Sequence, residues 1–425
     1  MLRSAIKARA FTRGYATAVT EAAGIKVASV DSGLPTSSIS VVVKAGSRYE
    51  PAPGVSHVLK SSLLKSTNKR SQIRLVREAE ALGGVLSTSL SREHLVLTAE
   101  FLKGDEAFFA EALGDAVTQA KLPVWEYNEE VVPQVQGEYE QGVRDSSVYA
   151  FDLAHQLAFR KGLGNSLFAS PHVAVDHSTA VSFAKASFAP SNLAVFGSNV
   201  DAGKLKSFVS EFFVSGASSS SSISTPASKY YGGEVRVPSV GHESLDKLLI
   251  AFQGAAATEV DFAVLRFLLG GDVAVKWGAG SSPLAKLTTA TSSAQAFNLA
   301  YSDAGLFGIA VSGKTADVSE VASKAIAALK EVKNGAAEEA VKQAVAKAKF
   351  AAASALETRA GQVEVIGHQV AYNGQAPSLE EVFAKLDKVS VESLSKAASS
   401  ALSSKPTTVA VGNTHALPYA DALGL

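Results

Sequence analysis

The sequence of 425 residues contains no cysteine, one methionine and two tryptophans. Without cysteine the chain cannot form disulfides or thiolate zinc sites, and it cannot use a cysteine nucleophile. Charge is scarce as well, because only 19% of the residues are charged and 40 basic residues balance 40 acidic ones. A net charge of zero gives no indication of nucleic acid or an anionic membrane surface as the main partner. No apolar run approaches the ~20 residues of a membrane-spanning helix, so we expect any membrane association to come through other subunits.

Apolar residues, in contrast, are plentiful. They make up 47% of the chain, which is enough for substantial cores, and the length favours two or more domains. A neutral chain with so few charges is more typical of a subunit of an assembly than of a free, highly soluble enzyme.

The N-terminal segment has a composition of its own. Its first 13 positions contain four basic residues, and no acidic residue precedes Glu21. Leu2, Ile6 and Ala10 would form one apolar stripe on a helix. A basic, acid-free and amphipathic segment is typical of a mitochondrial presequence, so we expect residues 1–15 to be one. A disordered basic tail is the alternative.

A serine-rich stretch, residues 216–228, divides the rest of the chain. Its serine run followed by Pro226 offers no side chains for a core, which is typical of a flexible linker. We therefore expect an N-terminal domain at residues 16–215 and a C-terminal domain at residues 229–425.

These two parts have similar patterns. Each opens with two strand-like runs, IKVASV and SISVVVKAGS in the first and GEVRVPS and KLLIAFQGAA in the second. Each closes with a β-branched strand running into a glycine, NLAVFGS and TTVAVGN. Period-2 strands mixed with long 3.6-period helices indicate α+β domains, whose sheets carry helices on one face. The shared order favours an internal duplication over a chance similarity between two α+β domains.

The residues alone give no active site. The eight histidines include no pair with the i and i+4 spacing of a helical zinc site. His172 and His177 are five residues apart beside Asp176, in a stretch whose composition favours a solvated turn over a metal site. The glycines of residues 269–282 match no phosphate-binding motif and indicate a loop.

A helix is expected around the stretch LVREAEALGG. Leu75, Val76 and Leu82 would form its apolar face, and Glu78 and Glu80 would lie in a solvated stripe. We therefore interpret these carboxylates as surface charge.

Two longer stretches resemble a known family. AGSRYEPAPGVSHVLKSSLLKSTNKRS and LVREAEALGGVLSTSLSREHLVLTAEFL are similar to the zinc metallopeptidases with the inverted H-x-x-E-H motif. FRKGLGNSL and YSDAGLFGI match further along, so the similar features run from about residue 25 to the C-terminus in the order of the family. This family includes the mitochondrial processing peptidase and the core proteins of respiratory complex III, and the likeness is closest to the core-protein branch.

The resemblance implies that the metal motif has been lost. His57 lies at the position of the first motif histidine, whereas Lys60 and Ser61 replace the glutamate base and the second histidine. The downstream glutamate ligand would fall near Glu138. One imidazole and one distant carboxylate cannot provide the four ligands that zinc prefers, and lysine cannot serve as the base that activates water. We expect no catalytic residue, no metal and no cofactor, and we interpret His57 as a packed or capping residue of a helix.

The resemblance also implies a fold, a function and partners. The fold would be two homologous domains arranged as a clamshell. The function would be that of a non-catalytic core subunit of complex III, on the matrix side of the mitochondrial inner membrane. Its partners would be core protein 1 and, as members of the dimeric complex, cytochrome b, cytochrome c1 and the Rieske protein, with no nucleic acid. The alternative is the presequence-binding α subunit of the processing peptidase, whose G-P-G-K-G loop is absent from residues 269–287.

Overall fold

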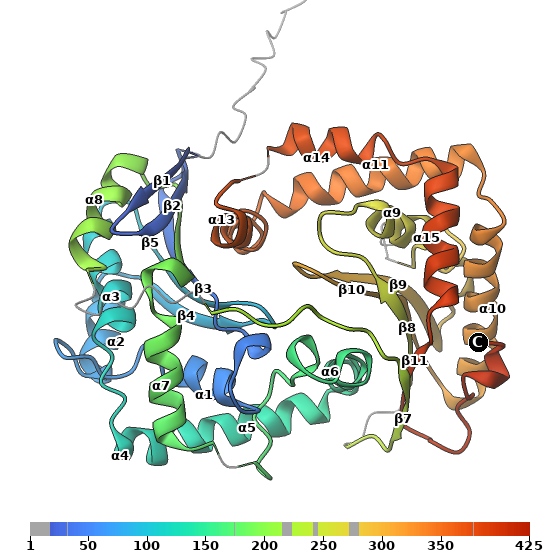
Figure 1. Ribbon diagram of the computed structural model, residues 1–425, viewed down its shortest axis with the longest axis horizontal. Helices are drawn as coiled ribbons and strands as arrows, with labels where there is room; N and C mark the ends of the chain where they lie inside the picture. The colour runs from blue at the N-terminus through green and yellow to red at the C-terminus, as the bar shows by residue number, and fades with distance from the viewer. Residues whose placement is uncertain are drawn as a thin grey trace, which may run out of the picture.

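The computed structural model describes residues 18–31, 33–173, 175–214, 223–240, 245–271, 280–376 and 378–425. The expected presequence lies outside these ranges, as do the first part of the expected linker and most of the glycine-rich stretch. Figure 1 shows two halves that lie side by side, each with its own sheet and its own outer helices.

Over the described residues, the first half is built on a mixed sheet of six strands. In chain order these are β1 (Ala18–Ala22), β2 (Ile25–Val30), β3 (Thr36–Val43), β4 (Val85–Leu90), β5 (Leu95–Leu102) and β6 (Leu193–Ser198). Their order across the sheet is β1-β2-β6-β3-β5-β4. The strands β2 and β6 pair in parallel, and all other neighbours pair antiparallel.

The described part of the second half contains a mixed sheet of five strands. In chain order these are β7 (Gly233–Val237), β8 (Asp246–Gly254), β9 (Ser292–Ala300), β10 (Gly305–Gly313) and β11 (Thr407–Val411). Their order across the sheet is β7-β11-β8-β10-β9, and β7 pairs with β11 in parallel. Without β1, the first sheet has this same order and the same directions of pairing. The shared topology supports the internal duplication and confirms the α+β fold class with two homologous domains.

The central strands are buried on both faces. Along β3, Val41 and Val43 pack into the outer core of the first half, and Val42 packs into a separate inner cluster. A strand with two covered faces needs a nearly continuous apolar run rather than an alternating one, and the run SISVVV meets this requirement.

The helices of the first half are α1 (Val55–Ser62), α2 (Gln72–Ala81), α3 (Glu106–Thr118), α4 (Val124–Glu126), α5 (Val132–Arg144), α6 (Ser146–Phe159), α7 (His177–Ser187) and α8 (Ala202–Phe212). Apart from α6, they cover the outer face of the first sheet or lie along its lower edge in Figure 1. A π-helical turn, Tyr127–Val131, joins α4 to α5.

The second half has a matching set of helices. They are α9 (Asp261–Leu269), α10 (Thr315–Lys333), α11 (Glu338–Ala355), α12 (Arg359–Gln362), α13 (His368–Asn373), α14 (Leu379–Leu386) and α15 (Val391–Ser403). A second π-helical turn, Val363–Gly367, joins α12 to α13. The helix α1 packs between α5 and α7, and α9 packs in the same way between α11 and α15.

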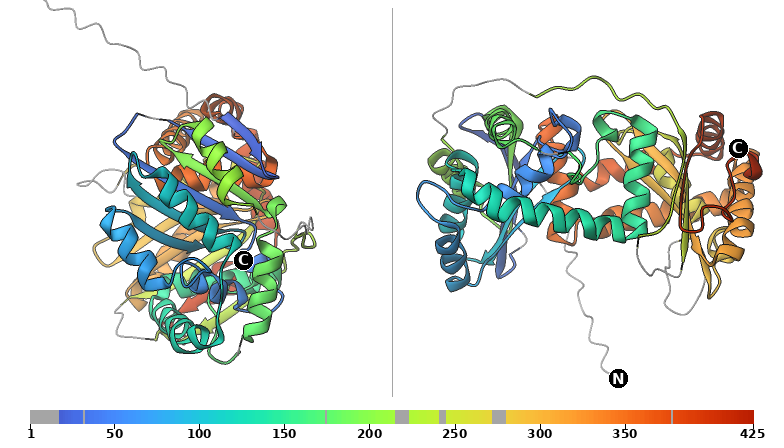
Figure 2. Two further views of the ribbon diagram at one scale, coloured as in Figure 1. Left: turned by 90° about the vertical axis from the view of Figure 1, so that its left-hand side faces the viewer. Right: turned by 90° about the horizontal axis from the view of Figure 1, so that it is seen from below.

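Each half also contributes a helix to the sheet of the other half. The helix α6 covers the inner face of the second sheet, where Ala154 and Phe159 lie in one cluster with Leu249 and Val409. The helical stretch from α12 to α13 covers the inner face of the first sheet (Figures 1 and 2). Burial of each large aliphatic side chain in these clusters stabilises the closed arrangement by about 1.5–3 kcal/mol. The two halves therefore share their cores.

The expected apolar face of α2 was wrong at one position. Leu75 and Ala79 are buried, whereas Val76 is 45% exposed. Leu75 and Ala79 are four residues apart and lie on one face of the helix. Val76 is rotated about 100° from Leu75 around the helix axis. Glu78 pairs with Arg70 on the polar side.

The described part of the serine-rich stretch, residues 223–228, has no helix or strand but is hydrogen-bonded to both halves. The amide of Ile223 donates to Oδ1 of Asn192 at 3.1 Å, and the amide of Ser228 donates to Oδ2 of Asp303 at 2.8 Å. Among the helices that the structure describes, none is long and apolar enough to span a membrane.

Candidate functional site

The predicted motif lies on α1, whose start is fixed by a glycine and a carboxylate. Gly54 has φ of 87°, and a Cβ at this position would lie 2.5 Å from Cβ of Ala169. Oε2 of Glu50 accepts hydrogen bonds from the amides of Gly54 and Ser56, at 3.1 and 3.2 Å. Burial raises the pKa of Glu50 to about 7, although these two bonds favour its charged form. The carboxyl group of Glu50 therefore caps the helix that presents the motif.

His57 is buried in the third position of α1, with only 3% of its surface exposed. Its Nδ1 accepts a hydrogen bond from the amide of Ala169 at 3.1 Å. The proton of the neutral imidazole must therefore be on Nε2, which donates to Oε2 of Glu138 at 2.6 Å. Phe168 packs edge-on against the ring, with centroids 5.8 Å apart. Burial lowers the pKa of His57, so the ring is held in this neutral tautomer.

Lys60 lies one turn further along α1 and reaches the same oxygen. Its Nζ donates to Oε2 of Glu138 at 2.5 Å, while Gln134 donates to Oε1 at 3.0 Å. Burial acts to raise the pKa of Glu138, but the hydrogen bonds from Lys60, His57 and Gln134 outweigh it and lower this pKa to about 2. Glu138 is consequently an anion whose charge is neutralised inside the chain.

The structure thus brings three of the four predicted positions into contact, namely His57, Lys60 and Glu138. Ser61 is buried on the same helix but takes no part in the contact, and its Oγ has no hydrogen-bond partner among the described residues. Both ring nitrogens of His57 form hydrogen bonds, and the ammonium group of Lys60 binds the carboxylate of Glu138. We refer to His57, Lys60 and Glu138 as the α1–α5 triad. Its chemistry is that of a structural ion pair between two helices.

A second polar centre joins the two halves, and the residues alone did not predict it. Arg48, which is 6% exposed, donates to Glu93 at 2.7 Å and to both oxygens of Asp303 at 2.8 and 2.6 Å. Its Nε also donates to Thr225 of the serine-rich stretch at 3.0 Å. The amide and hydroxyl groups of Ser302 donate to Glu93. Arg48, Glu93, Ser302 and Asp303 form what we call the clasp.

The charges of the clasp are mutually stabilised. Burial opposes ionisation of Arg48 and Asp303, but their paired hydrogen bonds raise the pKa of Arg48 and lower the pKa of Asp303. A bidentate pair between guanidinium and carboxylate fixes orientation as well as distance. Because Arg48 belongs to the first half and Asp303 to the second, the clasp fixes how the halves meet.

The turn between β4 and β5 contributes three consecutive side chains to the same interface. Arg92 donates to Asp152 at 2.8 Å, Glu93 enters the clasp, and His94 stacks on His368 of the second half with ring centroids 3.7 Å apart. Burial holds the pKa of His94 well below its usual value and lowers the pKa of His368 to about 4. Both rings of the stack are therefore neutral at physiological pH.

A third contact between the halves involves another buried histidine. Nδ1 of His155 lies 2.6 Å from the carbonyl oxygen of Phe151, which makes Nδ1 the donor. Nε2 then accepts from the hydroxyl group of Tyr301 at 2.7 Å. Burial raises the pKa of Tyr301 to about 12, so the hydroxyl group keeps its proton.

Comparison with known proteins gives the family. Residues 26–170 match the family described as insulinase (peptidase family M16), and residues 174–348 match the one described as peptidase M16 inactive domain. The chain is 44% identical to the mitochondrial cytochrome b-c1 complex subunit 2 of Cryptococcus neoformans, over 96% of the chain and 94% of the relative. The chain belongs to the M16 peptidase family, in its cytochrome b-c1 complex subunit 2 branch.

Other members of this branch are similar over the same length. Identity is 38% to the Neurospora crassa protein, over 100% of the chain and 96% of the relative. Identity is 27% to the human protein, over 94% of the chain and 90% of the relative. The expected resemblance to the core-protein branch of this family is confirmed.

Three of the stretches that carry the family resemblance lie at the contact between the halves. The stretches GSRYE, SREH and YSDAG contribute Arg48, Glu93, His94 and Asp303, which all lie at the contact between the halves. The resemblance drew attention to these stretches in the sequence, but it did not show that they contact one another.

The remaining histidine candidates are separate from both centres. His172 is exposed in a turn, and Asp176 accepts a hydrogen bond from the amide of Ser178 at the start of α7. Nε2 of His177 lies 2.7 Å from the carbonyl oxygen of Leu122. Over the described residues, no group of three or more histidine and acidic side chains is arranged to hold a metal ion.

Proposed function

We propose that this chain is a non-catalytic scaffold subunit of the cytochrome b-c1 complex, held on the matrix side of the mitochondrial inner membrane. The observation that carries the proposal is the similarity, over nearly the full length, to proteins named as subunit 2 of that complex. As a scaffold subunit, the chain would pair with core protein 1, in an assembly that includes cytochrome b, cytochrome c1 and the Rieske protein.

The α1–α5 triad supports a non-catalytic role. We infer that Lys60 and Ser61 stand where catalytic relatives have the glutamate base and the second histidine. A protonated lysine cannot accept a proton from water, and its charge repels a metal cation beside Glu138. Lys60 also neutralises Glu138, which removes the need for a metal to stabilise that carboxylate.

The contact between the halves supports a structural role. Peptide cleavage by a clamshell requires opening and closing, whereas a scaffold requires a fixed surface. The clasp, the stacked histidines and the two exchanged helices all resist opening. We infer that evolution of this branch has retained the closed form of the fold as a platform.

The alternative, a presequence-binding α subunit of the processing peptidase, is not favoured, because the relatives reported above are named as subunits of the cytochrome b-c1 complex. Affinity purification of the tagged chain from mitochondria distinguishes the two. We expect cytochrome b, cytochrome c1 and core protein 1 in stoichiometric amounts. Recovery of a catalytic peptidase subunit in their place would overturn the proposal.

A further inference from the structure

We infer that the first half carries a docking surface for an acidic and apolar segment of a partner protein. This surface is a hollow of about 330 Å³ between the end of α3, the loop that follows it and α7. Its apolar lining includes Val117, Leu122, Val181, Ala184, Phe188 and Ala189. We call it the α3–α7 hollow. The inference rests on the proposed function, because it names the kind of partner that the scaffold binds here.

The charged side chains of the α3–α7 hollow are all positive. Lys121 and Lys185 line it and are exposed, and no carboxylate is among its lining residues. Neither lysine forms an ion pair with another residue in the part of the chain that the structure describes. The nearby cations differ. Lys65 pairs with Glu130 of the π-helical turn before α5, and Lys69 and Arg70 pair with carboxylates of α3. Two positive charges are therefore left for an external partner.

Exposed apolar side chains continue this surface along the chain. Val124 and Trp125 are 55% and 56% exposed, and they follow Leu122 directly after one proline. Figure 1 places α4, which contains both, at the lower end of α7. A smaller hollow is also lined by Leu122 and Val181, so the two hollows lie next to each other. Tryptophan is enriched at the centres of protein interfaces, and a continuous exposed apolar patch indicates a binding surface.

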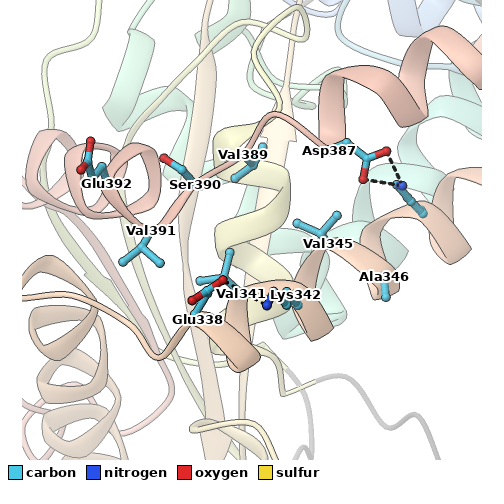
Figure 3. A pocket seen from close by; sticks show the side chains of 11 residues that line it. Glu338, Val341, Lys342, Val345, Ala346, Asp387, Val389, Ser390, Val391 and Glu392 are labelled. Atoms are coloured by element: carbon cyan, nitrogen blue, oxygen red, sulfur yellow. Dashed lines mark hydrogen bonds and ion pairs between the residues drawn. The ribbon is translucent and has the colours of Figure 1, made fainter.

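A larger hollow on the second half lacks this combination. It has a volume of about 730 Å³ and lies between α11 and the start of α15 (Figure 3). Its two lysines are already neutralised, because Lys342 pairs with Glu338 at 3.0 Å and Lys349 pairs with Asp387 at 2.6 Å. The α3–α7 hollow differs from this one, because its two lysines have no carboxylate partner among the described residues.

The chemistry favours a protein segment over a lipid surface. Attraction to an anionic membrane typically requires a cluster of about 4–8 basic residues, and this surface offers two unpaired ones. A segment with aliphatic side chains between two carboxylates matches the apolar floor and both lysines. We therefore assign the occupant to a neighbouring subunit of the assembly.

Charge reversal tests the inference. The double variant Lys121→Glu and Lys185→Glu is compared with Lys204→Glu and Lys206→Glu, a control with the same charge change at exposed positions of α8. We expect the first variant to bind the purified remainder of the complex about tenfold more weakly, at an unchanged melting temperature, while the control binds like the wild type. Equal binding by both variants would overturn the docking surface, whereas failure of the wild type to bind would overturn the proposed function.

The partner is identified by photo-crosslinking within the assembled complex. A photoreactive amino acid replaces Ser182, which is exposed on α7 beside Val181. Mass spectrometry is expected to find a crosslinked peptide of another subunit that contains aliphatic residues and at least two carboxylates. A crosslink to lipid, or to a second copy of this chain, would contradict the inference.

Discussion

At the level of single residues, one oxygen atom of Glu138 determines what the motif position can do. Nε2 of His57 and Nζ of Lys60 both donate to this oxygen, and Nδ1 of His57 is occupied by the amide of Ala169. The resulting α1–α5 triad contains its own counter-ion. We propose that this position, which the family resemblance equates with the metal site of catalytic relatives, contributes here to stability instead.

Replacing Lys60 with methionine tests this contribution. The change leaves Glu138 with a half-buried charge and without its cation, so we expect the free energy of unfolding to fall by about 1–2 kcal/mol in urea titrations. Arg144→Met is a matched control on α5, because Arg144 pairs with Glu140 at an exposed site and should cost less than about 0.5 kcal/mol. Equal losses in both variants would contradict the role of Lys60.

The triad also predicts a dependence of stability on acid. The pKa of Glu138 is about 2 in the folded chain and near 4.5 in the unfolded chain, so its stabilising effect is present above pH 4.5 and is lost as the pH falls towards 2. Glu138→Gln should flatten this part of the stability curve. Thermal melts of the variant and the wild type between pH 2 and pH 6 measure the difference, and parallel curves would refute the assignment.

Zinc content provides a further test at this scale. We expect the purified chain to contain far less than one zinc ion per molecule by mass spectrometry of the metal. We also expect a chelator to leave its melting temperature unchanged, because no step of folding depends on the metal. Stoichiometric zinc with chelator-sensitive peptide cleavage would contradict the account.

At the level of elements, the exchanged helices distinguish this molecule from two independent domains. The stretch from α12 to α13 crosses to the first sheet and brings His368 onto His94. The alternating and apolar runs predicted the strands well, because they depend on local pattern. The sequence did not predict the exchange of helices. Apart from β1, the two sheets have the same topology, and the apolar face of α6 does not show which of them it covers.

Two predictions show where the local sequence pattern was insufficient. Val76 was assigned to the apolar face of α2, but Leu75 and Ala79 are buried there while Val76 is 45% exposed. Apolar character alone did not show how wide the buried face of this helix is. The contact of Glu138 with His57 spans 81 positions and was foreseen only through the family resemblance. No local spacing encodes a contact of that length.

The stacked histidines predict acid sensitivity of the α13 contact. His368 has a pKa of about 4 when folded and near 6.5 when unfolded, so the unfolded chain binds more protons between these values. Stability should fall by up to about 3 kcal/mol as the pH is lowered from 6.5 to 4. His368→Phe keeps an aromatic ring against His94 and should remove part of this slope. Hydrogen exchange of residues 359–373 measures it, and an unchanged slope in the variant would rule out His368 as the cause.

At the level of the whole molecule, the clasp decides whether the two halves form one body. Arg48 of the first half holds Glu93 beside it and Asp303 across the contact, and Thr225 ties the serine-rich stretch to the same point. A composition rich in serine predicted a flexible linker, but hydrogen bonds fix its described part. The clasp therefore links the two halves at the same point where the serine-rich stretch passes between them.

Removal of the clasp should loosen the closed form. Arg48→Met removes the cation from the buried Glu93 and the partly exposed Asp303, and we expect a loss of about 2–3 kcal/mol together with a larger radius of gyration by small-angle scattering. Arg48→Lys keeps the charge without the bidentate geometry, so its stability should lie between that of the wild type and that of Arg48→Met. Arg359→Met is the control, because Arg359 also links the halves through the more exposed Glu100 and should cost less than about 1 kcal/mol. An Arg48→Met variant as compact and stable as this control would show that the clasp does not hold the halves.

The central claim is that this chain acts as a structural platform of the cytochrome b-c1 complex without catalysing a reaction itself. Native gel electrophoresis of mitochondria from cells lacking the gene tests it most directly. We predict that the fully assembled complex is absent or strongly reduced, and that the wild type and a Glu138→Gln variant both restore it. A normal amount of assembled complex in the cells without the gene would contradict the account.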